Sequence, residues 1–450
     1  MLTTRIVKRI VIGLIDLAIF IISLFLALSL RKLSIVSFLD FQNNVLPFFI
    51  IFFLNIIIFH MYGLYDKMTT KIYSELGSRV LSSQILAALF GALIFYSLPF
   101  FTISQKIILI IYIIISSLLI FIWRYYARIL IKSKENNKIL LVAQGEELFE
   151  LLREIKDNKI LNVKIIEYID LNNFSGGGIY TEIKKIIDEK KINMLAINMH
   201  HSRTKDYIPL LYDLLLKNVK VIDFVDLYEE VFERISLDNI DAGWFFQNLE
   251  QSENKNYEKV KRFLDLIISI PAFILTIPFY PIIYLILKYQ DNGDLFFILE
   301  RAGKNNVPFR IFKFRTMAQY INFTDKDEAS IVTKFGKFLR KSRINELPQL
   351  WNIIIGDMSL IGPRPEVLEL VKEYKNQIPF YDTRHLVTPG LSGPAQIFQD
   401  QNTIPKFGID ITGTKIKLSF DIYYLKQKSL LFDISLMIKT IKILIQRTGL

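Results

Sequence analysis

Four long apolar segments near the start of the chain constrain its fold more than any other feature. They cover Val11–Leu30, Val45–Met61, Val80–Phe101 and Ile107–Trp123, and each is close to the roughly 20 residues that a helix needs to cross a membrane. Of the whole chain, 52% is hydrophobic and no residue is cysteine. The sequence therefore predicts an N-terminal domain of four transmembrane helices over residues 1–135.

Lysine and arginine flank the four segments unequally. Basic residues precede the first segment, lie between the second and third, and follow the fourth, whereas the other two connections contain three basic residues between them. Because positive residues are retained in the cytoplasm, we expect everything after the fourth segment to be cytoplasmic. Asp16 lies inside the first segment, and since an intramembrane carboxylate is costly, we expect it to face another helix or to lie near the interface.

Short apolar segments then alternate with polar helical ones, which is typical of a parallel α/β sheet. The predicted strands are Lys138–Ala143, Val163–Ile169, Met194–Met199 and Val219–Phe224. We predict a Rossmann-like cytoplasmic domain over residues 136–250. The turn after the first strand reads Gln144-Gly145-Glu146 and lacks the glycine-rich phosphate-binding pattern, so the domain is degenerate and no dinucleotide cofactor is expected.

A fifth apolar segment, Phe263–Leu287, differs from the first four because it contains three prolines. As a straight helix it would extend about 37 Å, which is enough to cross a membrane. Mid-helix prolines favour a kink, and basic residues flank both ends, Arg262 before and Lys288 after. We predict a re-entrant helix over residues 263–287, broken at Pro278, with a straight crossing as the alternative.

Basic residues are concentrated in the segment that follows, and the net charge of the chain is +11. They include Arg301, Lys304, Arg310, Lys313, Arg315, Lys334, Lys337, Arg340, Lys341, Arg343 and Arg364. Carboxylates such as Glu346 and Asp357 share this region and would repel a nucleic-acid backbone, so no nucleic-acid partner is expected. Arginine and carboxylate together suit small phosphorylated substrates and Mg²⁺, and part of the basic surface is expected to contact anionic lipid.

Six short motifs occur in order within the C-terminal half. They read Lys261-Arg262-Phe263-Leu264-Asp265, Lys313-Phe314-Arg315-Thr316-Met317, Glu346-Leu347-Pro348-Gln349-Leu350-Trp351-Asn352, Gly356-Asp357-Met358-Ser359-Leu360, Gly362-Pro363-Arg364-Pro365-Glu366 and Pro389-Gly390-Leu391-Ser392-Gly393. This order resembles the monotopic polyprenyl-phosphate phosphoglycosyl transferases, the bacterial sugar transferase family, over about Tyr257–Leu450. The preceding helices and α/β domain are similar to the large membrane form of that family, whose re-entrant helix breaks at Ser-Pro where this chain has Ile277-Pro278.

The resemblance implies a mainly helical catalytic domain over residues 257–450 and a defined reaction. A sugar 1-phosphate passes from a UDP-sugar to undecaprenyl phosphate, which yields undecaprenyl-diphosphate-sugar and UMP. In the family this is the first membrane step of capsule, exopolysaccharide or O-antigen synthesis. The resemblance also implies Mg²⁺, a homodimer, and a place in the bacterial inner membrane with the catalytic domain on the cytoplasmic face.

The same resemblance assigns the candidate site residues. Lys313, Arg315, Arg340 and Arg364 are expected to bind the substrate phosphates, Asn345 and Glu346 occupy the positions of the catalytic pair, and Glu346 is the expected Mg²⁺ ligand.

The catalytic pair departs from the family pattern, which has aspartate where this chain has Asn345. In the family that aspartate attacks the sugar-bearing phosphate and forms a covalent phosphosugar enzyme. An asparagine amide is neutral, weakly nucleophilic and a poor Mg²⁺ ligand. Three hypotheses follow: a nearby carboxylate such as Glu346 is the nucleophile, the lipid phosphate attacks directly, or the protein is an inactive scaffold that binds without transferring.

Overall fold

The fold is given by a computed structural model that describes residues 2–65, 76–97, 103–131, 137–157, 163–173, 179–201, 204–249, 255–291, 293–318, 332–398 and 410–446. The chain divides into two compact units. The N-terminal unit contains residues 1–139 and 152–166, and the C-terminal unit contains residues 140–151 and 167–450. The domain boundaries predicted at 135–136 and at 250 lie outside the described residues.

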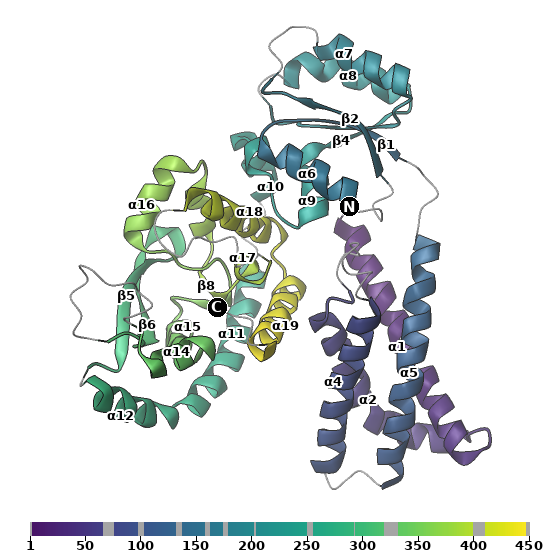
Figure 1. Ribbon diagram of the computed structural model, residues 1–450, viewed down its shortest axis with the longest axis vertical. Helices are drawn as coiled ribbons and strands as arrows, with labels where there is room; N and C mark the ends of the chain where they lie inside the picture. The colour runs from purple at the N-terminus through teal and green to yellow at the C-terminus, as the bar shows by residue number, and fades with distance from the viewer. Residues whose placement is uncertain are drawn as a thin grey trace. The chain divides into compact units, whose positions relative to one another are not determined.

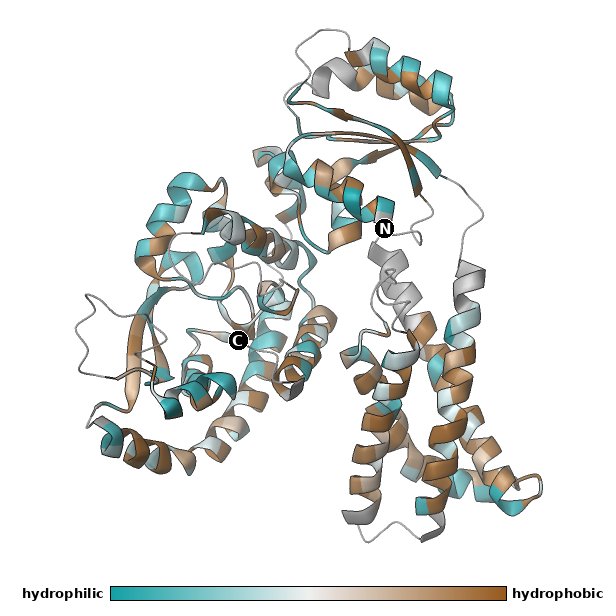
Figure 2. Ribbon diagram, viewed as in Figure 1, coloured by the Kyte–Doolittle hydropathy of each residue, from teal (hydrophilic) through white to brown (hydrophobic). Residues whose placement is uncertain are grey.

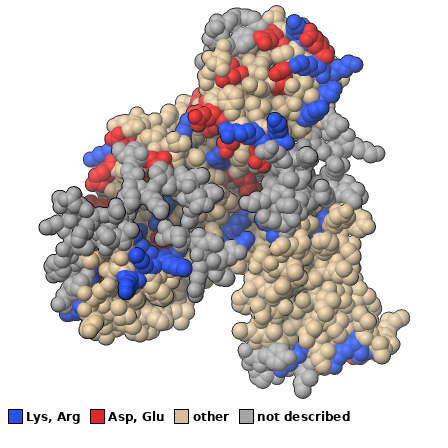
Figure 3. Space-filling model, in the orientation of Figure 1, with Lys and Arg blue, Asp and Glu red and all other residues tan. Residues whose placement is uncertain are grey.

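Four apolar helices form most of the N-terminal unit. They are α1 (Leu2–Lys32), α2 (Phe38–Met61), α4 (Leu76–Ser97) and α5 (Ile103–Ile131). Each contains 20 to 24 consecutive residues that are apolar enough to cross a membrane, and Figure 2 shows hydrophobic residues along their lengths. In Figure 3 the surface over these helices is mostly free of charged side chains. The four predicted membrane helices are thereby confirmed, and together they form a membrane domain.

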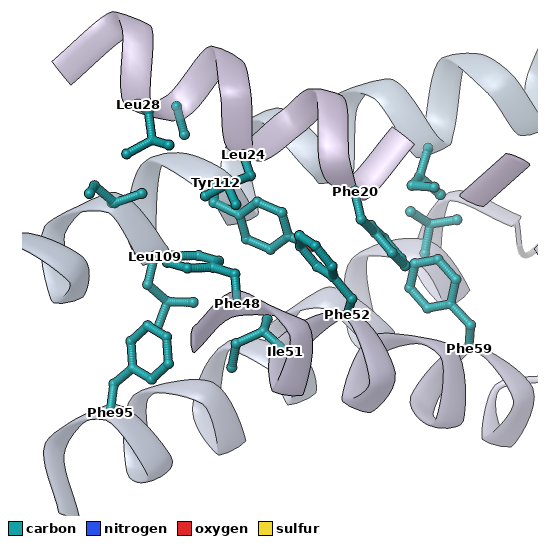
Figure 4. Close-up of a cluster of buried hydrophobic side chains, with 14 of the residues drawn as sticks. Phe20, Leu24, Leu28, Phe48, Ile51, Phe52, Phe59, Phe95, Leu109 and Tyr112 are labelled. Carbon is teal, nitrogen blue, oxygen red and sulfur yellow. The ribbon is translucent and has the colours of Figure 1, made fainter. Parts of the chain in front are cut away.

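Aromatic rings from all four helices fill the core of the bundle (Figure 4). Phe48 on α2 packs edge-on against Phe95 of α4, with ring centroids 5.3 Å apart, and against Tyr112 of α5 at 5.5 Å. Phe20 of α1 contacts Phe52 on the same α2 face at 6.1 Å. Edge-to-face and offset ring pairs stabilise packing beyond the burial of their area. Because the hydrophobic effect does not drive helices together in lipid, such packing contacts hold the bundle together.

A buried ion pair links α1 to α5. Asp16 Oδ2 lies 2.5 Å from Arg124 Nη2, and the two side chains are 0% and 1% exposed. Arg124 Nη1 also donates to the carbonyl oxygen of Leu64 at 2.8 Å. As expected, Asp16 faces another helix. Removing one partner of such a pair costs about 3–5 kcal/mol because the other charge remains buried, so the pair fixes the register of the two helices.

The next region is a mixed α/β structure with a four-stranded sheet. Its strands are β1 (Asn137–Ala143), β2 (Val163–Asp170), β3 (Met194–Ile197) and β4 (Lys220–Asp223), in the order β2-β1-β3-β4. Strands β3 and β4 pair in parallel, which confirms a parallel sheet. The helices are α6 (Glu146–Asp157), α7 (Ile179–Lys190), α8 (Thr204–Leu216) and α9 (Phe224–Phe232). Figure 1 shows α7 and α8 on one face and α6 and α9 on the other.

The rest of the C-terminal unit is mainly helical with two small sheets. An antiparallel pair joins β5 (Phe296–Ala302) to β6 (Pro308–Phe314), and a parallel pair joins β7 (Ser359–Ile361) to β8 (Gly390–Ser392). The helices are α10 (Ala242–Leu249), α11 (Lys255–Thr276), α12 (Phe279–Asp291), α14 (Lys334–Lys341), α15 (Gln349–Ile355), α16 (Leu368–Gln377), α17 (Pro394–Phe398), α18 (Ile411–Gln427) and α19 (Leu430–Gln446). Short 3₁₀ segments are η1 (Leu237–Asn239), η3 (Lys304–Asn306), η4 (Ile344–Glu346) and η5 (Tyr381–Leu386).

The fifth apolar segment forms a bent helix pair. Helices α11 and α12 meet at Ile277-Pro278 and differ in direction by 53°. Proline has no N–H to donate and its ring obstructs the preceding turn, so the bend falls at the predicted residue. The apolar side chains of Leu275 and Phe279 beside it are 72% and 56% exposed. This geometry is that of a broken span or a re-entrant loop.

Candidate active site

The first motif holds α11 to the rest of the C-terminal unit. Arg262 donates to the last carbonyl groups of α15, and Asp265 accepts the N–H of Leu360 at 3.1 Å. Lys261 forms an ion pair with Asp433 of α19 at 2.8 Å. These charged residues bind α15, β7 and α19, and so they fix α11 relative to the elements that carry the site.

Helix α15 is attached to β6 by the side chain of Asn352, which is fully buried. Its Nδ2 donates to the carbonyl oxygen of Arg310 at 2.7 Å, and its Oδ1 accepts the N–H of Phe312 at 3.2 Å. A buried amide that completes both hydrogen bonds fixes backbone register firmly. Because Glu346 precedes α15 and Lys313 follows Phe312, this contact places the two charged side chains close to each other.

Helix α14 approaches the end of β6 unusually closely. A Cβ atom at Gly336 would lie 2.0 Å from the carbonyl oxygen of Thr316, so only glycine fits there. The side chain of Thr333 caps the helix by accepting the N–H of Gly336 at 2.9 Å. The close packing lets Arg340 Nε donate to Thr316 Oγ1 at 2.9 Å. Arg340 is therefore directed toward the end of the strand that carries Lys313.

Glu346 is the centre of a cluster of cations. Its Oε1 lies 3.0 Å from Arg364 Nη2, and its Oε2 lies 3.4 Å from Arg343 Nη1. The carboxylate is 14% exposed, whereas the Arg364 side chain is 41% exposed. Each carboxylate oxygen thus has its own guanidinium, and Arg364 also presents surface to an incoming ligand.

The electrostatics of this cluster follow from burial and from mutual charge. Burial favours the neutral form of Glu346, but the charges of Arg364 and Lys313 outweigh it and lower the pKa of the carboxyl. Glu346 is therefore ionised at neutral pH. Burial and then Arg364 lower the pKa of Lys313 to about 8, although Glu346 opposes the shift. Lys313 can thus lose its charge just above neutrality.

The structure brings Lys313, Arg340, Glu346 and Arg364 together, and Arg315 makes backbone contacts beside them in the chain. Lys313 lies within electrostatic range of Arg340, Glu346 and Arg364. Arg315 is 7% exposed and donates to the carbonyl oxygens of Asp294 and Met317 at 2.8 and 3.0 Å. Its guanidinium thereby links the chain before β5 to the chain after β6, at the end of the pair where Phe296 lies opposite Phe314.

Arg343 was not among the predicted site residues. It lies in the left-handed region at φ 55° and ψ 14°, directly before η4. This conformation is costly for a residue with a side chain, and it turns the chain so that Arg343 and Glu346 meet. A basic residue three positions before the carboxylate is the only sequence signal of this contact.

Asn345 lies half-buried in η4, next to Glu346. Within the part of the chain that the structure describes, no group of three or more His, Cys, Asp or Glu side chains could hold a metal ion. Mg²⁺ is commonly bound by one or two carboxylates together with substrate phosphates. Glu346 would be the one carboxylate of that shared mode here, and the substrate diphosphate would supply the other ligands, because the cations around Glu346 would repel Mg²⁺ on its own.

The carboxyl edge of the α/β sheet is filled by the chain itself. Glu147 at the start of α6 accepts the N–H groups of Leu237 and Asp238 at 2.9 and 3.1 Å. Gln144, after β1, donates to the carbonyl oxygen of Asp238 at 2.6 Å, and its own N–H is accepted by Asn239 at 3.0 Å. A nucleotide phosphate bound at this helix start would meet the carboxylate of Glu147 and the η1 residues bound to it, so the residues present do not fit one.

We expect Lys313 to titrate at about pH 8 in the folded protein, well below the ordinary lysine value near 10.4. Below pH 8 it is charged, and as pH rises through 8 it becomes neutral and reactive. Competitive acylation followed by peptide mass analysis should show half-maximal labelling of Lys313 near pH 8. Arg364→Met removes a neighbouring positive charge and should move the midpoint upward. A Lys313 midpoint above 10 in the wild type would contradict the arrangement.

Comparison with known proteins connects this cluster to a family. Residues 256–447 match the family model of the bacterial sugar transferases, and residues 60–221 match one described as a CoA-binding domain. The filled sheet edge does not fit a phosphate-bearing cofactor of that kind.

Among curated proteins, the chain is 35% identical over 239 residues to an Aeromonas hydrophila UDP-N-acetylgalactosamine-undecaprenyl-phosphate N-acetylgalactosaminephosphotransferase, covering 52% of this chain and 54% of the relative. It is 33% identical over 212 residues to a Xanthomonas campestris pv. campestris UDP-glucose:undecaprenyl-phosphate glucose-1-phosphate transferase, covering 45% and 43%. An Escherichia coli (strain K12) protein of the latter name is 32% identical over 189 residues, covering 40% and 39%.

The chain thus spans about half the length of the curated relatives that it matches. The matched residues contain the ordered motifs, Glu346 and the cations that surround it. Residues 256–447 therefore resemble the bacterial sugar transferases, and four helices long and apolar enough to cross a membrane precede them in the chain.

Proposed function

We propose that this protein transfers a sugar 1-phosphate from a UDP-sugar to undecaprenyl phosphate and releases UMP. The observation that carries the proposal is the ionised Glu346 between Arg364 and Arg343, with Lys313 nearby, in a bacterial sugar transferase domain. Relatives named for this reaction act on UDP-glucose or UDP-N-acetylgalactosamine. The proposal therefore extends to the class of UDP-sugars and to polysaccharide biosynthesis, without choosing the sugar.

The cations meet the main electrostatic demand of this reaction. A lipid phosphate and a sugar diphosphate repel each other, and fixed donors stabilise the charge that develops during phosphoryl transfer. We propose that Lys313, Arg340 and Arg364 bind phosphate oxygens. Arg315, which was expected to do the same, holds the backbone beside Lys313 through its two carbonyl contacts.

The proposed bond changes balance without any further reagent. An oxygen nucleophile bonds to the β-phosphorus of the UDP-sugar, and the bond from that phosphorus to the bridging oxygen breaks. UMP leaves with the bridging oxygen, while the sugar keeps its bond to the oxygen of the transferred phosphate. If Glu346 attacks first, the lipid phosphate then displaces it; if the lipid phosphate attacks first, one step suffices. Both routes give undecaprenyl-diphosphate-sugar.

In this proposal Asn345 is a neutral neighbour of the reacting groups and Glu346 is the required carboxylate. A lowered pKa keeps Glu346 ionised, so it can hold Arg364 and Arg343 in place as well as act as a ligand or nucleophile. The scaffold hypothesis is disfavoured because the cation cluster is present and the relatives are named as transferases.

We also propose that Mg²⁺ binds at Glu346 together with the substrate diphosphate. When bound, the ion would offset negative charge on the diphosphate and favour UMP as the leaving group. Glu346 would supply the protein oxygen, and Arg343 and Arg364 would keep that oxygen oriented.

The bent pair α11–α12 suits a helix that enters and leaves the membrane on one face. Basic residues occur at both ends, Lys259 and Arg262 before and Lys288 after, and exposed apolar side chains surround the bend. We propose that residues 263–287 are re-entrant and that the catalytic domain of residues 257–450 lies on the cytoplasmic face of the bacterial inner membrane. The Rossmann-like domain of residues 136–250 and a homodimer complete the proposed architecture.

Replacing the central carboxylate tests the proposed chemistry. Glu346→Gln should lower UMP release from a panel of UDP-sugars, with Mg²⁺ and undecaprenyl phosphate, by at least about 100-fold, since removing one charged group of a preorganised site costs that much. Glu300→Gln, an exposed glutamate on β5, is the control and should keep wild-type activity. A silent wild type with an active Asn345→Asp variant would show that the protein binds without transferring.

Cysteine labelling tests the re-entrant helix, because the native chain contains no cysteine. Lys259→Cys and Tyr289→Cys lie outside the two ends of the bent segment; both positions are exposed, and Tyr289 is 97% exposed. An impermeant maleimide should label both in inside-out vesicles and neither in right-side-out vesicles. Leu33→Cys, 91% exposed after α1, should give the opposite pattern. Labelling of the two ends from opposite sides would mean that the segment crosses.

A further inference from the structure

A second arginine, Arg384, binds the backbone of Arg364. Arg384 Nη2 donates to the backbone carbonyl oxygen of Arg364 at 3.0 Å. Arg384 Nη1 donates to the hydroxyl of Tyr381 at 2.8 Å, and the guanidinium lies 5.3 Å from the centroid of that ring. Arg384 belongs to η5 and is 2% exposed, so it is out of reach of a ligand in the open part of the site.

The charge of Arg384 is balanced by Asp421 of α18. Asp421 Oδ2 lies 2.9 Å from Arg384 Nη2, and the two side chains are 1% and 2% exposed. Such a buried pair adds little stability compared with apolar residues of similar size. What an apolar pair could not supply is a directed hydrogen bond to the Arg364 carbonyl. The pair therefore has a role that packing does not explain.

The loop that carries Arg364 is held to the protein by its carbonyl groups, and the carbonyl of Arg364 is the one that Arg384 binds. Arg364 lies between Pro363 and Pro365, neither of which has an N–H to donate. The carbonyl oxygen of Pro363 accepts the N–H of Gly390 at 2.9 Å. A Cβ atom at Gly362 would lie 2.6 Å from the carbonyl oxygen of Thr388, so the loop is tightly packed on β8. Arg384 fixes the carbonyl group of the following residue, Arg364, and the side chain of Arg364 reaches Glu346.

We propose that Arg384, held by Asp421 and Tyr381, is a positioning residue that sets the orientation of Arg364 against Glu346. The inference rests on the proposed function, in which Arg364 binds a phosphate oxygen. Arg364 is then bound at both ends, by Arg384 at its carbonyl and by Glu346 at its guanidinium. Misplacement of a substrate-orienting group by about 1 Å can cost roughly 100-fold in rate, which sets the scale of the expected effect.

A double-mutant cycle between Arg384 and Arg364 tests this proposal in the full-length protein. Arg384→Met should lower kcat/KM for sugar-phosphate transfer by about 10- to 100-fold. Arg384→Lys, which keeps the charge beside Asp421, should recover part of that loss. In an Arg364→Ala background, Arg384→Met should lower the rate less than threefold further, because the group that it positions is absent. Each variant is first shown to unfold cooperatively by thermal denaturation.

Glu229→Gln on α9 provides a matched control, because it breaks a different buried ion pair to α18, the helix that carries Asp421. Glu229 pairs with Lys426 of α18 at 2.7 Å, with side chains 7% and 13% exposed, and it makes no contact with the Arg364 loop among the interactions of the described residues. In the double variant with Arg364→Ala, the fold-loss of kcat/KM should equal the product of the two single fold-losses, because the two sites are independent. Effects of Arg384→Met and Arg364→Ala that also multiply would overturn the proposal, as would full activity in folded Arg384→Met.

Failure of the proposed function gives a different result from failure of this inference. If the wild type turns over no UDP-sugar, the transferase proposal fails. The same double-mutant cycle is then measured with the dissociation constant for UDP in place of kcat/KM. Arg384→Met and Arg364→Ala should each weaken UDP binding at least threefold, with the double variant no weaker than Arg364→Ala alone. Independent effects on UDP affinity would overturn the positioning role by themselves.

Discussion

The ion pair between Glu346 and Arg364 is the interaction on which the candidate site depends. A carboxylate that is largely removed from water needs compensating charge, and here each of its oxygens faces a guanidinium. The charge of Arg364 lowers the pKa of Glu346, and burial together with the same charge lowers the pKa of Lys313. The site is thus preorganised for anions, with its one central carboxylate already ionised.

The scaffold around this pair consists of backbone contacts made by side chains from distant parts of the chain. Arg262 binds the end of α15, Asn352 binds β6, and Arg384 binds the peptide that carries Arg364. Each contact fixes an element rather than a ligand. In the membrane domain Arg124 combines such a backbone contact, to the carbonyl oxygen of Leu64, with the ion pair to Asp16 that joins two apolar helices. Polar groups in both units are therefore placed where they fix register.

Sequence reasoning predicted what local chemistry determines. Apolar length predicted the four membrane helices, proline placed the bend at Ile277-Pro278, and the ordered motifs indicated the transferase domain. Contacts between distant residues could not be read in this way. Arg315 resembles a phosphate ligand in its motif but binds two carbonyl oxygens, and Arg384 lies 20 residues from its acceptor. The edge of the α/β sheet is likewise filled by η1, which lies about 90 residues after Gln144 and Glu147 in the chain.

The fate of the β-phosphorus tests the central claim most directly. A UDP-sugar labelled with ³²P at the β-phosphorus would be incubated with the purified protein, Mg²⁺ and undecaprenyl phosphate, and the label would be followed in lipid and nucleotide fractions. The account predicts that the label moves into the lipid while UMP is released. Label that remains in released UDP, with the sugar alone on the lipid, would contradict sugar-phosphate transfer and the role of the cation cluster around Glu346.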